Sequence, residues 1–262
     1  GSLSGLRGLD SLLSGDSYDY KSLRRNPLYA DRLCAPYLGH ERIGKIMTQQ
    51  VLVIAAHPYD ETLAAGATIA RLAAEGAYIK LLTFTDGVSA RGKTTSNRNS
   101  KLDGVCTKLG IKDYTFANYP DNRLDIISLL EKCKYIEESV DFEPDIIFTH
   151  HPSCLNIDHK HCYEATITAF RPQTGKPQQI LAYSVPSSTD YNPLNTFHPT
   201  VYYDVSGTYN IKIECLKENY AEEMRLFPHA RSYENIENLM KVAGNEVGLA
   251  YAEKFQLIRD IR

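Results

Sequence analysis

The chain has 262 residues, of which 43% are hydrophobic and 23% are charged, and its formal net charge at pH 7 is −3. This composition is typical of a globular protein and excludes disordered and fibrous chains. A chain of this length buries enough surface to fold without a disulfide or a structural metal. The sequence pI near 6.3 argues against a nucleic-acid-binding protein, which normally carries a basic patch.

Membrane-spanning and disulfide-rich proteins are also disfavoured. No apolar run in the sequence approaches the ~18 residues of a membrane-spanning helix. The six cysteines form no CxxC pair and show no regular spacing, which is the usual pattern of free thiols in a chain of this size. We therefore expect no membrane span and predict a cytoplasmic location.

Residues 1–46 form the first of two predicted domains. They are rich in Leu, Ser and Tyr without a strong periodicity, and Gly1-Ser2 has the look of a cloning remnant. We interpret them as an N-terminal arm, a lineage-specific extension that covers the body or contacts another subunit. A homo-oligomer is therefore a candidate assembly, and the second domain is predicted over residues 47–262.

From Gln50 onward the pattern alternates between strands and helices. Val51–Ala56 is a continuous apolar run, as expected of a strand buried on both faces of a parallel sheet. The other predicted strands are Tyr78–Thr85, Tyr114–Ala117, Asp145–Thr149, Ile180–Val185, Thr200–Val205 and Tyr251–Ile258. The predicted helices are Glu61–Ala74, Lys101–Leu109, Leu124–Val140, Asp158–Phe170, Lys212–Arg225 and Ile236–Val242. This order predicts an α/β fold with a Rossmann-like, doubly wound, mostly parallel sheet.

Polar residues gather where the first four predicted strands end. The clusters are His57–Glu61, Thr85–Gly87, Asn118–Arg123 and His150–His159. In open α/β sheets, ligands bind beyond the carboxyl ends of the strands. These clusters therefore predict a ligand site on one rim of the sheet.

Within these clusters, His57, Asp60 and His159 form a candidate metal site. His57 and Asp60 lie three residues apart in a tight strand-to-helix turn, and His159 arrives at the start of the helix after the fourth strand. Three nitrogen and oxygen ligands leave positions open for water and substrate, as in catalytic zinc sites. Zinc lowers the pKa of its water to about 7 and polarises a carbonyl oxygen, which equips a site for amide or ester hydrolysis.

A plainer interpretation of the same residues stays open. Asp60 and Asp158 both stand where an aspartate often caps the start of a helix. His57 alone is more often a hydrogen-bonded turn histidine than a metal ligand. Spacing therefore suggests a metal site without establishing it.

The segment from Ala56 to Glu61 reads AHPYDE and resembles the AHPDDE signature of the LmbE-like, or PIG-L, de-N-acetylase family. The resemblance continues in segments 85–91, 121–125, 149–159, 227–232 and 251–255, and it covers about residues 48–259. It implies a Rossmann-like fold and a zinc-dependent hydrolase. The implied substrate is a small molecule, an N-acetylated amino sugar or a sugar conjugate, which loses its acetyl group.

The resemblance also implies roles for individual residues. It makes His57, Asp60 and His159 the metal ligands, with Fe²⁺ as an alternative to Zn²⁺ because such sites are not selective by affinity alone. Asp158 matches the acidic residue beside the ligand histidine, where it orients a histidine or tunes its charge. We count it among the catalytic residues.

Three further positions are implied to contact the sugar. Arg91 and Asp121 fall where the family places sugar-contacting residues. Asn156 stands where some members carry a histidine that serves as electrophile and general acid. His150 or His151 is a candidate to supply that imidazole, and we take His151 as the catalytic one.

Two departures from the family pattern concern proton transfer. Tyr59 replaces the acidic residue that serves the family as general base, and an unperturbed tyrosine, with a pKa near 10, is a poor base at neutral pH. Cys154 stands where related sequences usually carry an acidic residue.

Two functions of different class stay open. The chain is either an N-deacetylase whose base is Asp158, Glu61 or one of the paired histidines, or an inactive relative. The inactive relative would bind zinc and a sugar or nucleotide-sugar without hydrolysis. Nucleotide binding of the usual Rossmann kind is disfavoured, because no GxGxxG follows the first strand.

Overall fold

The computed structural model describes residues 48–87, 98–172 and 178–262. The predicted N-terminal arm lies outside these residues, so the division of the chain at residue 46 stays a prediction. The strands are β1 (Gln50–Ala55), β2 (Tyr78–Thr85), β3 (Asp113–Tyr119), β4 (Ile146–His150), β5 (Gln178–Tyr183), β6 (Val201–Asp204) and β7 (Ala252–Ile261).

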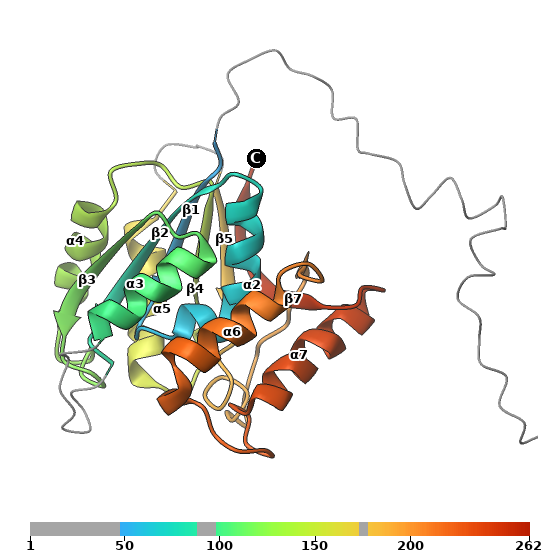
Figure 1. The fold of residues 1–262 in the computed structure, drawn as a ribbon. Helices are drawn as coiled ribbons and strands as arrows, with labels where there is room; N and C mark the ends of the chain where they lie inside the picture. Colours follow the sequence, from blue (N-terminus) through green and yellow to red (C-terminus); the bar gives the residue numbers. More distant parts are fainter. Residues whose placement is uncertain (1–47, 88–97, 173–177) are drawn as a thin grey trace, which may run out of the picture. The chain divides into compact units, whose positions relative to one another are not determined.

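In the described residues these seven strands form one sheet in the order β3-β2-β1-β4-β5-β7-β6 (Figure 1). Strands β1 to β5 pair in parallel, whereas β7 runs antiparallel to both β5 and β6. The prediction of an α/β fold with a mostly parallel sheet is therefore confirmed.

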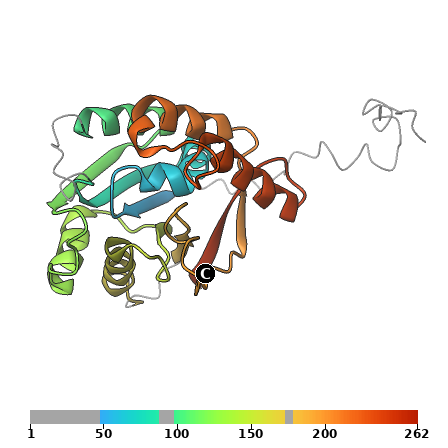
Figure 2. The ribbon, with the colours of Figure 1, turned by 90° about the horizontal axis from the view of Figure 1, so that it is seen from below.

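Helices cover both faces of this sheet. They are α2 (Asp60–Ala74), α3 (Arg98–Leu109), α4 (Leu129–Ser139), α5 (Ile157–Ala169), α6 (Tyr209–Asn219) and α7 (Tyr233–Glu246), with a short 3-10 helix, η3 (Ala221–Glu223). Helices α4 and α5 pack together in one layer, and α2, α3 and α6 pack together in the other (Figure 2). This is the doubly wound arrangement that the alternating pattern predicts.

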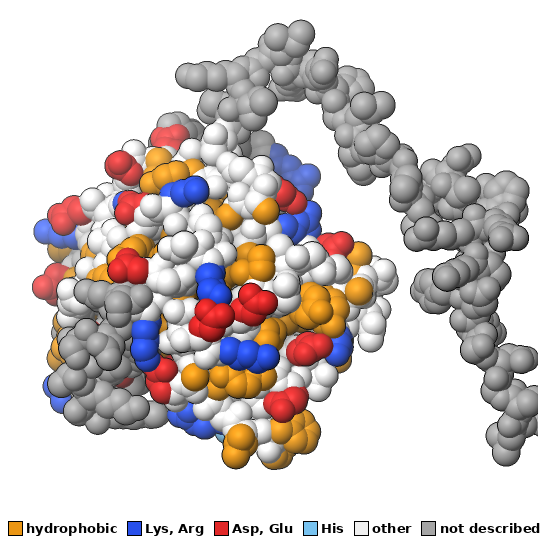
Figure 3. Space-filling view, in the orientation of Figure 1, with side chains coloured by type: hydrophobic (Ala, Val, Ile, Leu, Met, Phe, Trp, Pro, Cys, Tyr) orange, Lys and Arg blue, Asp and Glu red, His pale blue; other side chains and the backbone are white. Residues whose placement is uncertain are grey.

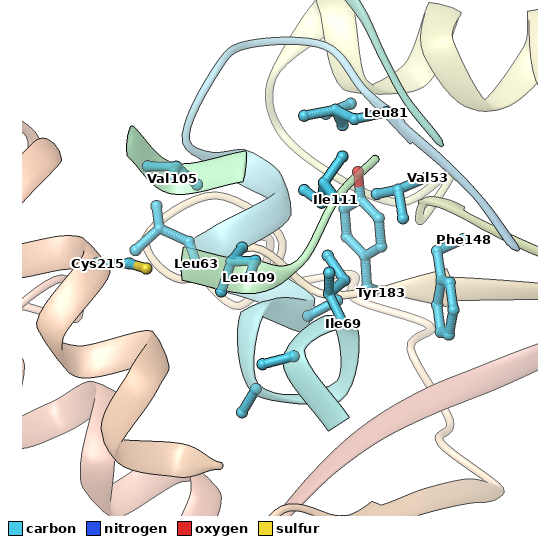
Figure 4. Packing of buried hydrophobic residues seen from close by; sticks show 14 of the residues in the cluster. Val53, Leu63, Ile69, Leu81, Val105, Leu109, Ile111, Phe148, Tyr183 and Cys215 are labelled. Carbon is cyan, nitrogen blue, oxygen red and sulfur yellow. The ribbon is translucent and has the colours of Figure 1, made fainter. Parts of the chain in front are cut away.

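β1 shows why the sheet needs both layers. Its alternate side chains Val51 and Val53 belong to the apolar cluster on the α2, α3 and α6 side, whereas Leu52 and Ile54 belong to the cluster under α4 and α5. All four are fully buried, and each such side chain contributes roughly 1.5–3 kcal/mol through its burial. Figure 4 shows part of the first cluster, including Val53 of β1 and Leu63 of α2.

The helix predicted over Leu124–Val140 is wrong in its first turn, because α4 begins only at Leu129. Ser128 caps α4: its hydroxyl accepts the N–H of Glu131, and the Glu131 carboxylate accepts the N–H of Ser128. The N–H of Leu124 donates instead to Asp158 Oδ1, 2.9 Å away. This bond to a distant residue holds Leu124 in the turn that precedes α4.

The helix predicted over Lys212–Arg225 also differs from the observed one. α6 ends at Asn219, and Tyr220 leaves helical backbone with φ −128°. Residues 220–232, here named the α6–α7 connection, then carry η3 and lead to α7. Arg225 therefore lies in a connecting segment and not in a helix.

None of the described helices has the length and hydropathy needed to cross a membrane. On the face drawn in Figure 3, Lys and Arg side chains are interspersed with Asp and Glu, and no large area carries a single sign. That face therefore does not offer the extended positive surface to which a nucleic-acid backbone binds.

Candidate active site

The candidate site lies at the carboxyl end of β1, where the direction of the strand order reverses. β1 pairs with β2 on one side and with β4 on the other. The chain leaves β1 into α2 and leaves β4 into α5, and these helices pack on opposite faces of the sheet. Such a reversal opens a crevice at which α/β proteins bind their ligands.

The turn after β1 brings His57 and Asp60 together. α2 begins at Asp60 itself, and the N-cap is Tyr59, whose side chain makes no capping hydrogen bond. Asp60 Oδ2 accepts the N–H of His57 at 3.1 Å. The interpretation of Asp60 as a helix cap is therefore wrong, because its carboxylate turns back toward His57.

Tyr59 takes a left-handed backbone conformation with φ 117° to make this turn. For a bulky residue such a conformation is strained, and strain of this kind concentrates at functional sites. The ring of Tyr59 is buried and lies 5.9 Å from the His57 ring, nearly parallel to it. Burial raises the pKa of the Tyr59 hydroxyl further above its ordinary value, so Tyr59 stays protonated at neutral pH.

His159 completes a triangle of donor atoms. Its Nε2 lies 3.1 Å from Asp60 Oδ2 and 3.2 Å from His57 Nδ1, and the last two atoms are 2.9 Å apart. Ligand atoms that lie about 2.0–2.2 Å from a zinc ion are roughly 3.0–3.5 Å from one another. Asp60 Oδ1 is buried and has no hydrogen-bond partner among the described residues. The triangle therefore fits a metal ion that nitrogen and oxygen atoms bind.

The electrostatics of the triangle favour a positive charge. Burial by itself lowers the pKa of a histidine, yet the pKa values of His57 and His159 are raised because of acidic neighbours, Asp60 among them. Burial would raise the pKa of Asp60, but the two imidazoles hold it well below its usual value. A proton or a metal ion is therefore stabilised where the three side chains meet.

The other ring nitrogen of His57 faces two carboxylates. His57 Nε2 lies 3.1 Å from both Asp121 Oδ1 and Asp158 Oδ2, which gives a second group able to hold a metal. The oxygens of Asp158, however, already accept the N–H groups of Asn122 at 2.7 Å and Leu124 at 2.9 Å. A carboxylate on the second nitrogen of a ligand histidine fixes the ring and its tautomer. The triangle with His159 is therefore the better candidate.

Asn156 sets the start of α5. Its side-chain oxygen accepts the N–H groups of Asp158 at 2.8 Å and His159 at 3.3 Å, so Asn156 is the N-cap. The interpretation of Asp158 as the cap is wrong for this reason. The cap leaves the side chains of Asp158 and His159 available to His57 and Asp60.

The two adjacent histidines at the end of β4 diverge. His150 is buried, its Nε2 accepts the N–H of Ala56 at 2.9 Å, and its ring stacks on His159 at 3.9 Å. Burial, together with the charge of His159, holds the pKa of His150 well below its usual value. His151 lies instead beside Ser153, with 2.8 Å between Nδ1 and Oγ, and does not line the pocket. The structure brings His150, and not His151, to the triangle.

Cys154 contacts His159 on the ring nitrogen that faces away from the triangle. Its Sγ lies 3.1 Å from His159 Nδ1 and 2.8 Å from Ser188 Oγ. Burial would raise the pKa of this thiol, but the hydrogen bond with His159 lowers it to about 7. Cys154 thus takes the position in which a carboxylate often supports a ligand histidine.

Gly87 packs the loop after β2 against the turn that holds His57. A Cβ at this position would lie 3.1 Å from Pro58 Cδ and 3.3 Å from His57 Cβ, and the backbone has φ +65°. Both the close approach and the left-handed backbone require glycine.

A pocket of about 380 Å³ opens in front of His57. One side is formed by the strand ends, with His57, Tyr59, Gly87, Asp121, Asn122 and Asn156. The other side is formed by Ser187 and by Glu223, Arg225, His229 and Arg231 of the α6–α7 connection. Its volume is that of a small-molecule site, and its polar lining suits a sugar.

The pocket contains some of the expected residues and adds others. Asp121 and Asn156, both predicted to contact a sugar, line it, whereas Arg91 lies outside the described residues. Arg225 was predicted within a helix and without a role. The resemblance in segment 227–232 is the signal that could have pointed to His229 and Arg231.

Comparisons with known proteins point to one family. The family model described as PIG-L, GlcNAc-PI de-N-acetylase, matches residues 52–170. The uncharacterized deacetylase YaiS of Escherichia coli (strain K12) is 31% identical over 175 residues, which cover 64% of this chain and 89% of YaiS.

Two further similarities concern proteins named for sugar substrates. A 1D-myo-inositol 2-acetamido-2-deoxy-alpha-D-glucopyranoside deacetylase of Nocardiopsis dassonvillei is 33% identical over 88 residues, which cover 28% of this chain and 31% of that protein. A solved structure of the N,N'-diacetylchitobiose deacetylase from Pyrococcus horikoshii has a TM-score of 0.65 at 18% identity. The match covers 81% of this chain and 84% of that chain, and it shows a shared fold.

Proposed function

Because the chain belongs to the PIG-L family of deacetylases, we propose that it is a zinc-dependent hydrolase that removes an N-acetyl group from an amino sugar or a sugar conjugate. The observation that carries this proposal is the triangle of His57, Asp60 and His159, of which His57 lines a polar pocket. Fe²⁺ is the alternative ion, since nitrogen and oxygen sites do not separate such metals by affinity alone.

The residues around the triangle have two roles, which are to position the ligand histidine and to bind the sugar. When bound, the ion would supply an acidic water and polarise the amide carbonyl. Asp158, held by two backbone N–H groups, fixes the ring of His57 through Nε2. Asp121, Asn122 and Asn156 line the pocket and offer hydrogen-bond partners to sugar hydroxyls.

The step that takes a proton from water is the weak part of this site. Tyr59 is buried and protonated, and the loss of a general base typically slows a reaction about 10²–10⁴-fold. Glu61 does not replace it: Oε2 accepts the N–H of Tyr59, Oε1 accepts the hydroxyls of Thr62 and Tyr220, and the side chain does not line the pocket. Slow turnover is therefore the expected behaviour.

The position of Tyr59 also favours a second candidate function. A relative that keeps the metal and the sugar pocket but lacks the base would bind its ligand without hydrolysing it. The alternative differs from the main proposal in turnover only, because both require the same triangle and pocket.

Elemental analysis of the purified chain, followed by assays of amine release from N-acetyl amino sugars, tests both. About one zinc or iron per chain, together with amine release, is the expected result. If the chain binds metal and binds a sugar saturably but releases no amine, the deacetylase proposal fails and the non-hydrolytic binding function is supported. A chain that takes up no metal even after zinc is added would overturn both candidates.

A further inference from the structure

We propose that the substrate carries an anionic group, a phosphate or a carboxylate, and that Arg225 binds this group at the edge of the pocket. The inference rests on the proposed deacetylase function, since it concerns the part of the substrate that lies away from the acetamide. It follows from the different states of the two arginines on the α6–α7 connection.

The pocket lining divides into residues of the strand ends, here called the reacting side, and residues of the α6–α7 connection. Of the three triangle residues, His57 lines the pocket, and it is 1% exposed. Arg225 and Arg231 reach the pocket from the α6–α7 connection, and Arg225 is exposed to solvent. An acetamide bound at His57 and a second group of the same sugar bound at Arg225 would therefore both lie in this one pocket.

The guanidinium of Arg231 is already engaged. Its Nε donates to Ser187 Oγ at 2.7 Å and to the carbonyl of Pro186 at 3.3 Å, and its Nη1 lies 3.9 Å from Glu223 Oε2. The group also lies 5.5 Å from the centroid of the Tyr59 ring. Arg231 is therefore held as part of the wall, with its charge partly balanced by Glu223.

Arg225 is anchored but keeps its binding edge free. Its Nη1 donates to the carbonyls of Glu222 at 2.9 Å and Met224 at 2.7 Å. Within the described part of the chain, Nε and Nη2 of Arg225 donate to no group, and no ion pair includes this residue. Nε and Nη2 form one edge of the guanidinium, the edge that meets two oxygens of a carboxylate or a phosphate at once.

A neutral sugar does not use this arrangement. Hydroxyl groups already find amide and carboxylate partners in Asp121, Asn122 and Asn156 on the reacting side. A charge fixed by two backbone carbonyls and left without a counter-ion is worth most to a ligand that brings the opposite charge. The chemistry therefore selects an acidic N-acetyl amino sugar.

The test compares three substrates that share the acetamide. N-acetylglucosamine 1-phosphate and N-acetylmuramic acid carry the two candidate anions, and methyl N-acetylglucosaminide is the neutral reference. We expect kcat/KM for at least one acidic sugar to exceed that for the neutral sugar about tenfold or more, mainly through KM. The preferred acidic sugar identifies the anion, because one of the two carries only a phosphate and the other only a carboxylate.

Arg225→Gln is the decisive variant. A hydrogen bond to a charged group contributes about 1.5–3 kcal/mol, so the acid-to-neutral ratio should fall roughly 10- to 100-fold. Arg225→Lys keeps the charge but loses the planar edge. Its acid-to-neutral ratio should lie between that of the unmodified chain and that of Arg225→Gln. Arg171→Gln removes an exposed arginine that does not line the pocket, and it should keep the ratio of the unmodified chain.

Each outcome decides the inference separately from the proposed function. Equal kcat/KM for acidic and neutral sugars would overturn it, and so would a preference that survives Arg225→Gln, since the anion would then bind elsewhere, for example at the metal. If no sugar is hydrolysed, the deacetylase proposal fails, and calorimetric binding of the same three sugars takes over as the test. Tighter binding of an acidic sugar that depends on Arg225 would still support the inference, whereas equal binding would refute it.

Discussion

Two of the buried groups of charged side chains among the described residues differ in how completely they are paired. Lys212 of α6 and Glu253 of β7 form the first, with 2.7 Å between Nζ and Oε1. The Glu253 carboxylate also accepts the N–H groups of Ala67 at 3.2 Å and Thr68 at 2.7 Å. One cation meets one anion, and the carboxylate oxygens have partners.

The triangle and its surroundings form the second group, and there the pairing is incomplete. Three carboxylates, Asp60, Asp121 and Asp158, surround the ring of His57, and Asp60 Oδ1 has no partner in the described residues. Both groups are buried to a similar degree, so burial of charge alone does not identify a functional site. The two groups differ instead in the surplus of acceptors at the triangle, which leaves room for a cation from outside.

Removal of one triangle residue should have the largest effect. His57→Ala should lower the metal content from about one ion per chain to almost none, and amine release should fall to background, because a ligand and its charge are lost together. Elemental analysis and the amine assay measure this. Lys212→Met, which opens the first group instead, should keep the metal; a loss of metal there would mean that the two groups are not independent.

A carboxylate at position 59 should produce the next largest change. Tyr59→Asp should raise the rate of amine release by about 10²–10⁴, the usual contribution of a general base. Tyr59→Asn removes the same ring without adding a base and is the matched control. An equal gain in both variants would show that the bulk of Tyr59, and not its poor basicity, limits the reaction.

The first group should matter for stability. Lys212→Met leaves the buried Glu253 charge without its partner and should lower the free energy of unfolding by about 3–5 kcal/mol in a urea titration. Lys108→Met breaks an exposed pair with Glu218, whose side chains are 33% and 57% exposed, and should lower the free energy of unfolding far less, because solvent screens the pair. Similar losses in the two variants would contradict the role assigned to burial.

The smallest expected effect concerns Cys154. Cys154→Ala removes the group that holds His159 Nδ1 and should weaken metal affinity about 10- to 100-fold in competition with a chelator. Cys154→Ser should recover part of the loss. Cys162 is an equally buried cysteine, and its thiol donates to the carbonyl of Ile54, 3.9 Å away. If Cys162→Ala weakens metal binding as much, the effect is one of packing.

The sequence was informative where the site depends on local chain geometry. His57 and Asp60 share one turn, and the continuous apolar runs located the strands that carry the turn. The alternation of side chains along β4 is a local signal that favours His150 over His151. Alternate residues of β4 face one side of the sheet, which places His150 on the same face as Phe148, in the cluster under α2.

The opposite wall of the pocket had no such signal. The α6–α7 connection reaches the strand ends only through tertiary packing, so no spacing along the chain relates Arg225 to His57. The start of α4 was missed for a similar reason, because the N–H of Leu124 serves Asp158 and not the helix. Where a hydrogen bond to a distant residue decides the conformation, the local pattern cannot predict it.

The close packing at Gly87 makes the geometry of the His57 turn depend on a residue of another loop. Even a methyl group there would press on Pro58 and His57, and the backbone at φ +65° would add strain to any other residue. Position 87 has no reactive group and takes no part in proton transfer. A substitution at this position would therefore disturb the turn that holds His57, although no chemically active side chain is exchanged.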